Sequence, residues 1–147
     1  MNDYFRRTHG RILRKFLLHD VDFVLIGGHA AIYHGVERTT SDLDILVRPT
    51  LQNGTKIIAA CKDIGLDVSD LASEDFTKSN VFSFGMIPNG VDILNYSVGI
   101  SIDDIFRLRA NYNAKQNVTF IYGTDADNGE IKDKLNGLIL IKIKTNK

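Results

Sequence analysis

The segment FVLIGGHAAIYHGVERTTSDLDILVR, residues 23–48, decides the fold that we expect for this chain. Its four opening apolar residues, 23–26, predict a buried strand. The pair Gly27-Gly28 interrupts this run, and the small residues that follow predict a short helix. After a polar link, residues 42–47 predict a second strand. The segment thus predicts a strand, a glycine turn, a helix and another strand in immediate succession.

Two aspartates on the second strand are the most informative residues. Because side chains alternate across a strand, Asp42 and Asp44 face one side and Leu43 faces the other. Two neighbouring carboxylates repel each other, and a cation between them relieves the repulsion. Mg²⁺ binds through one or two carboxylates together with substrate phosphates, and two ions about 3.5–4 Å apart can stabilise the attacking and leaving oxygens of a phosphoryl displacement. The aspartate pair therefore predicts a metal site.

The glycine pair predicts a phosphate site beside the aspartates. A backbone without side chains can approach a phosphate closely, and the N-terminus of the following helix attracts anions. His29 directly follows the pair and can either contact a phosphate or serve only as a polar turn residue. Either motif alone is a weak signal, because many strand ends carry two acids and many turns carry two glycines. Their combination in this order and spacing is much more specific.

These residues carry a resemblance to a known family. Gly27-Gly28-x-Ala30, then Gly35, then Arg38-x-Thr40-x-Asp42-x-Asp44, is similar to the motif of the nucleotidyltransferase domain of the DNA polymerase beta superfamily. Within that superfamily, the chain most resembles the small bacterial branch of AbiEii-type abortive-infection toxins and minimal nucleotidyltransferases. The motif covers residues 26–47, and the wider resemblance extends to Tyr96. Many relatives have Ser where this chain has Gly28.

The resemblance implies a third carboxylate on a later strand, adjacent to the strand of the aspartate pair. Asp92 is the candidate, because it lies in an apolar stretch where an isolated acid is costly unless it is paired or binds a metal. Its alternative role is an ion pair with Arg38 or another base. By resemblance, the catalytic and metal-binding residues are Asp42, Asp44 and Asp92, which would hold two Mg²⁺ ions, or Mn²⁺ in their place. The nucleotide-binding residues would be Gly27, Gly28, His29, Arg38, Thr40 and Ser41.

Periodicity and turn signals complete the expected fold. Helices are predicted over residues 4–19, 51–64 and 101–112, and further strands over 81–87, 91–96 and 117–122. We expect one α/β (α+β) domain over residues 1–147, with a small mixed, mostly antiparallel sheet flanked by helices, as in the polymerase-beta-like nucleotidyltransferase fold. The site is expected at the ends of the strands at 24–26, 42–47 and 91–96. Relative to the resembling proteins, the C-terminal part from about residue 117 to 147 looks truncated.

Composition limits the classes of protein that fit. The chain has 44% hydrophobic and 24% charged residues, as soluble globular proteins do. Its formal net charge of zero provides no global basic field for nucleic acid. The basic helix predicted over residues 4–19 is either a solvated face or a contact for the phosphates of a nucleic-acid acceptor. A single cysteine, Cys61, excludes an internal disulfide and suits the reducing cytoplasm. No apolar run approaches about 18 residues, so no membrane span is expected.

Two functions of different classes follow from the resemblance. The first is an Mg²⁺-dependent enzyme that transfers a nucleotidyl group from a nucleoside triphosphate to an acceptor hydroxyl, on an RNA end or a protein side chain. Its setting would be a toxin–antitoxin or phage-defence system, with a cognate antitoxin or toxin protein as partner. The alternative is an inactive protein of the same fold that acts as a binding or antitoxin-like partner. The presence of all three acids favours the enzyme.

Overall fold

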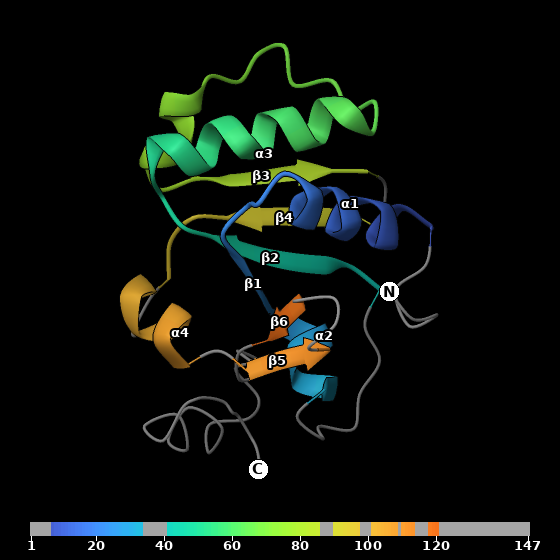
Figure 1. Ribbon diagram of the computed structural model, residues 1–147, viewed down its shortest axis with the longest axis vertical. Helices are drawn as coiled ribbons and strands as arrows, with labels where there is room; N and C mark the ends of the chain where they lie inside the picture. The colour runs from blue at the N-terminus through green and yellow to red at the C-terminus, as the bar shows by residue number, and fades with distance from the viewer. Residues whose placement is uncertain are drawn as a thin grey trace.

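The computed structural model describes residues 7–33, 41–85, 90–97, 101–108, 110–113 and 118–120. Its elements, in chain order, are α1 (Arg7–Leu18), β1 (Phe23–Ile26), α2 (Gly27–Tyr33), β2 (Leu43–Val47), α3 (Leu51–Asp63), the 3₁₀ helix η1 (Ser73–Thr77), β3 (Val81–Phe84), β4 (Val91–Leu94), α4 (Ile102–Leu108), β5 (Ala110–Asn113) and β6 (Val118–Phe120) (Figure 1). None of the described helices is long and apolar enough to cross a membrane. Gly35, a glycine of the motif that carries the family resemblance, lies outside the described residues.

The strands form one sheet in the order β3-β4-β2-β1-β6-β5. Strands β2 and β4 run parallel, as do β1 and β6, and the other neighbours run antiparallel. The expected small α+β fold with a mixed, mostly antiparallel sheet flanked by helices is therefore confirmed. Because β2 and β4 are parallel and far apart in sequence, the chain between them must cross over, and it does so through α3, η1 and β3.

The two faces of the sheet bury different sets of side chains. Alternate residues of β1 show this, because Phe23 and Leu25 belong to the larger core cluster, while Val24 belongs to the smaller one. The larger cluster packs under α1 and α3, which lie side by side in Figure 1. The smaller cluster packs under α4 through Ile105 and Phe106. The sheet is thus covered on both faces along β1 and β2.

Local signals explain the bounds of α3. Thr50 caps its N-terminus, because the Thr50 hydroxyl accepts a hydrogen bond from the backbone N–H of Asn53 at 3.1 Å. Gly65 follows its C-terminus with a φ of +84°, and its N–H donates to the carbonyl of Lys62. The stretch after the helix contains η1, which packs against α3.

The C-terminal end of the predicted helix 101–112 is wrong. Helix α4 starts as expected, with the Ser101 hydroxyl accepting from the N–H of Asp104 at 3.1 Å, but it ends at Leu108. Residues 110–113 instead form β5, which pairs with β6. The asparagines Asn111 and Asn113 have low helix propensity, and pairing with a neighbouring strand overrides the weak helical pattern.

Candidate functional site

Two of the predicted acids face each other on neighbouring strands. Asp44 of β2 and Asp92 of β4 are direct partners in the parallel register. Both are half-buried, and both alternate with residues of the larger core cluster, so they lie on the α4 side of the sheet. The expected position of Asp92, on the strand next to that of the aspartate pair, is confirmed.

Asp42 approaches the same end of the sheet from just before β2. Its Oδ1 accepts a hydrogen bond from the N–H of Gly90 at 3.0 Å. The carbonyl of Gly90 in turn accepts from the N–H of Leu43 at 3.0 Å. Because Gly90 lies two residues before Asp92, this pair of bonds fixes the start of β4 against the start of β2. Asp42 is therefore joined to the segment that delivers Asp92.

The glycine turn touches the acids directly. Gly27 ends β1 with a φ of +73°, and Ile26 before it is the register partner of Asp44. A Cβ built on Gly27 would lie 2.3 Å from Oδ2 of Asp44, so only glycine fits there. We expected a close approach at both glycines, and the positive φ falls on Gly27. Gly28 follows as a buried residue in the first turn of α2.

The described part of the site also includes a histidine, His9, that no sequence motif indicates. Nε2 of His9, on α1, lies 3.2 Å from the carbonyl oxygen of Gly90. Its ring meets the ring of His29 edge-on, with centroids 5.8 Å apart. His29 is only 8% exposed, so its ring is packed inside the protein. His9 thus connects α1 to the glycine turn and to the start of β4.

The remaining predicted nucleotide-binding residues are less informative. Ser41 is exposed and directly precedes Asp42. Arg38 and Thr40 lie outside the described residues, so their roles stay predictions.

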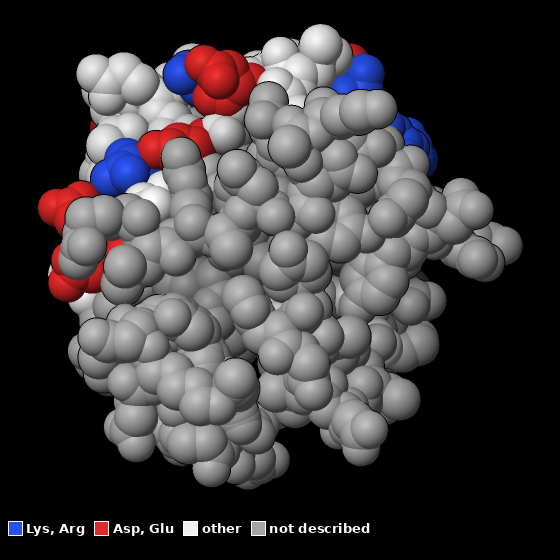
Figure 2. All heavy atoms as spheres, turned by 60° about the horizontal axis from the view of Figure 1, so that its bottom comes forward, with Lys and Arg blue, Asp and Glu red and all other residues white. Residues whose placement is uncertain are grey.

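Among the described side chains on the face drawn in Figure 2, basic and acidic groups are interspersed, and neither sign dominates.

The carboxylate oxygens at this site suit a metal ion whose remaining ligands come from the substrate and from water. Within the described ranges, no group of three or more histidine, cysteine or acidic side chains could hold an ion unaided. The facing carboxylates of Asp44 and Asp92 nevertheless provide two hard oxygen donors side by side. Mg²⁺ commonly takes one or two carboxylates and completes its coordination with water and phosphate oxygens. The residues therefore fit an ion that arrives with a polyphosphate, and they do not form a complete protein cage.

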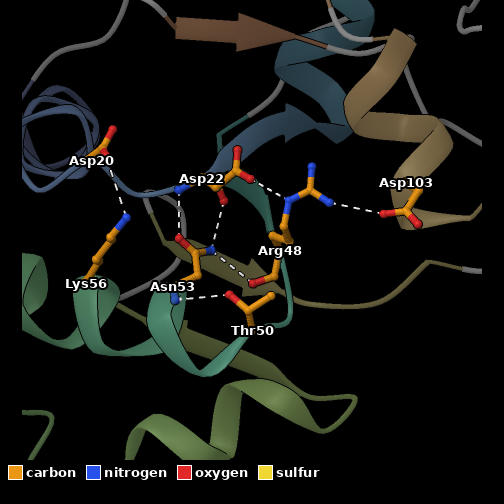
Figure 3. Close-up of polar contacts among 7 residues, drawn as sticks. All are labelled: Asp20, Asp22, Arg48, Thr50, Asn53, Lys56 and Asp103. Carbon is orange, nitrogen blue, oxygen red and sulfur yellow. Dashed lines mark hydrogen bonds and ion pairs between the residues drawn. The ribbon is translucent and has the colours of Figure 1, made fainter.

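A second polar cluster lies at the opposite end of β2 (Figure 3). The Arg48 guanidinium donates to Asp22 and, at 3.1 Å, to Asp103, and it stacks over the ring of Phe106 at 4.3 Å. Asn53 accepts from the N–H of Asp22 and donates to the carbonyls of Asp22 and Arg48. These contacts tie β2 to α3 and α4. The cluster is therefore structural, and it leaves the acids at the other end of the strand as the candidate chemical site.

The chain was compared with protein-family models, with curated proteins and with solved structures. No family model, curated protein or solved structure matches it.

Proposed function

We propose that this protein is a metal-dependent nucleotidyltransferase of the type found in the DNA polymerase beta superfamily. It transfers a nucleotidyl group from a nucleoside triphosphate to an acceptor hydroxyl. The observation that supports this proposal most directly is the register of Asp44 and Asp92, which face each other beside the side-chain-free backbone of Gly27. The resemblance of the segment from Gly27 to Asp44 to the motif of that superfamily supports it independently.

The chemistry asked of the chain is mainly binding and orientation. In the reaction, the acceptor oxygen forms a bond to the α-phosphorus, the bond to the bridging oxygen breaks, and pyrophosphate leaves. A bound Mg²⁺ would supply charge neutralisation to the phosphates. Asp42 and Asp44 would hold this ion at the triphosphate end of the site, and Gly27 leaves room for the Asp44 carboxylate against the turn. Asp92 would hold the ion on the acceptor side and help to remove the proton of the attacking hydroxyl.

The acceptor and the cellular setting follow from the resemblance alone. In the small bacterial branch that the chain resembles, an RNA end or a protein side chain fits the acceptor role. A toxin–antitoxin or phage-defence system, with a cognate antitoxin or toxin protein, fits the setting. Both belong to the same proposal and are tested by identifying the labelled product.

Transfer of label from a triphosphate tests the proposal. The purified protein is incubated with each α-labelled nucleoside triphosphate, Mg²⁺ and a cell extract, and label is sought on RNA and on protein. We expect label on one of the two, loss of label in Asp44→Asn and in Asp92→Asn, and retention in Asp70→Asn. Asp70 is a suitable control because it is an exposed acid in the turn between α3 and η1.

Two results would overturn the proposal. Transfer that persists in both site variants would show that the facing carboxylates take no part in it. Absence of label with every triphosphate, together with stable capture of one protein from the extract, would favour the inactive binding partner instead.

A further inference from the structure

Ser83 lies opposite Asp92 on the edge strand of the sheet. The two residues are direct partners in the antiparallel register of β3 and β4. The Ser83 hydroxyl donates a hydrogen bond to Oδ1 of Asp92 at 2.6 Å. This length lies within the range of about 2.5–3.0 Å that is usual for a hydrogen bond between a hydroxyl and an oxygen. Within the described part of the chain, Ser83 is the side chain that hydrogen bonds to Asp92.

Packing does not explain why a serine occupies this position. Its neighbours Phe82 and Phe84 pack against the larger core cluster, and Phe82 stacks on Phe76 with ring centroids 4.4 Å apart. Ser83 points to the other face and is exposed. An exposed strand position favours a β-branched or aromatic residue over serine. The feature that serine provides here is a small hydroxyl within reach of Asp92.

A hydrogen bond to one oxygen fixes the direction of the other. A carboxylate can rotate about its terminal bond, and the like charge of Asp44 on the next strand favours turning away from it. With Oδ1 of Asp92 held by Ser83, the plane of the carboxylate is set. The donor is neutral, so the orientation is fixed while the negative charge is retained.

We propose that Ser83 is a positioning residue that holds Asp92 in its metal-binding orientation. This inference rests on the proposed function, because it takes Asp92 as a metal ligand. Partners that hydrogen bond to a metal-binding carboxylate typically contribute about 10–100-fold in metal affinity. Loss of the Ser83 hydroxyl should therefore weaken metal binding without unfolding the strand.

Titration with Mn²⁺ alone, followed by the electron paramagnetic resonance signal of the free ion, tests the inference. We expect Ser83→Ala to bind Mn²⁺ about 10–100-fold more weakly than the wild type. Ser83→Thr keeps the hydroxyl and should bind as the wild type does. Val81→Ala is the matched control, because Val81 lies on the same face of β3 and is 46% exposed. Urea unfolding without metal should give nearly equal midpoints for Ser83→Ala and Val81→Ala.

The outcomes separate this inference from the function on which it rests. If Asp92→Asn loses Mn²⁺ affinity but Ser83→Ala keeps it, the positioning role is overturned and the proposed function stands. Equal weakening by Ser83→Ala and Val81→Ala would also overturn it, because the cause would be a loosened edge strand. If Asp92→Asn binds as tightly as the wild type, or the wild type binds no Mn²⁺, the metal-binding role of Asp92 fails and the inference fails with it.

Discussion

Replacing Gly27 by alanine tests the contact between the glycine turn and the acid site. Gly27 has a φ of +73°, and a Cβ there would lie 2.3 Å from Oδ2, 3.1 Å from Cγ and 3.2 Å from Cβ of Asp44. Rotation of the Asp44 side chain could relieve the contacts with Oδ2 and Cγ, whereas the contact with Cβ at 3.2 Å requires the backbone of one residue to move by a few tenths of an ångström. The variant should therefore be destabilised by backbone strain and by displacement of Asp44.

Gly65 supplies a matched control for the strain alone. Its φ is +84°, and nothing lies within 4 Å of a Cβ built there. Left-handed backbone costs an L-residue about 1–2 kcal/mol, so Gly65→Ala should lower the free energy of unfolding by about that amount. Gly27→Ala should lower the free energy of unfolding by the same amount for strain and by a further amount of about 0.5–3 kcal/mol for the clash with Asp44, which is the usual range of interaction energies between residues in contact.

A double-mutant cycle isolates that additional term. Asp44→Ala removes the two nearest of these atoms, Oδ2 and Cγ, so the loss of stability caused by Gly27→Ala should fall toward that caused by Gly65→Ala. Urea unfolding followed by far-ultraviolet circular dichroism measures all the free energies, and it suits a chain without tryptophan. Equal costs for Gly27→Ala and Gly65→Ala, or an unchanged cost of Gly27→Ala in the Asp44→Ala background, would refute the reasoning.

Four further predictions concern the scaffold. Gly54→Ala should be destabilising by about 1–3 kcal/mol in urea, because its Cβ would lie 2.6 Å from a backbone carbonyl of η1; a neutral result would mean that η1 moves freely. Asn53→Ala should lower the free energy of unfolding by about 1–3 kcal/mol in the same assay, because it leaves partly buried backbone groups of Asp22 and Arg48 without their hydrogen-bond partner. A loss below about 0.5 kcal/mol would contradict this. Burial raises the pKa of the Cys61 thiol to about 11, so iodoacetamide should alkylate it at pH 8 only after denaturation, and rapid labelling of native protein would show otherwise. The hydrogen bond from His19, followed by the hydrogen bond and charge of Lys15, lowers the pKa of Asp63. The ionised Asp63 therefore stabilises the fold above the pKa it has in the unfolded chain, and this stability is lost as the pH falls below about 4. Asp63→Asn should remove this part of the pH dependence, and identical acid-unfolding curves for the variant and the wild type would contradict the prediction.

The elements that could be predicted from sequence are those with strong local signals. The apolar run 23–26 forms β1 as expected, and α3 begins after Thr50 and ends before Gly65. The placement of Asp92 could also be predicted, because an acid in an apolar strand needs a reason to be there, and the family resemblance supplied one. Each of these expectations depended on a short window of sequence or on a motif with known spacing.

The features that could not be predicted depend on contacts between distant residues. Strand β5 forms because β6 pairs with it, against a weak helical pattern. His9 reaches Gly90 across 81 positions, and no local pattern indicates such a contact. The choice of Gly27 over Gly28 for the positive φ depends on how Asp44 of β2 meets the turn, which the glycine pair alone does not specify. The role of Ser83 likewise required the register of β3 against β4.

Among the described residues, the hydrogen bonds near the two ends of β2 differ in the charge of their donors. At the C-terminal end, the Arg48 guanidinium binds Asp22, so it both orients this carboxylate and neutralises its charge (Figure 3). At the N-terminal end, Asp42 is oriented by a backbone N–H and Asp92 by the hydroxyl of Ser83, and both of these donors are neutral. A neutral donor restricts the direction of a carboxylate without cancelling its charge. Holding like charges side by side costs stability, and this cost is recovered when a cation binds. The described contacts of β2 therefore anchor the fold at its C-terminal end, and next to its N-terminal end the hydroxyl of Ser83 orients Asp92 without neutralising it.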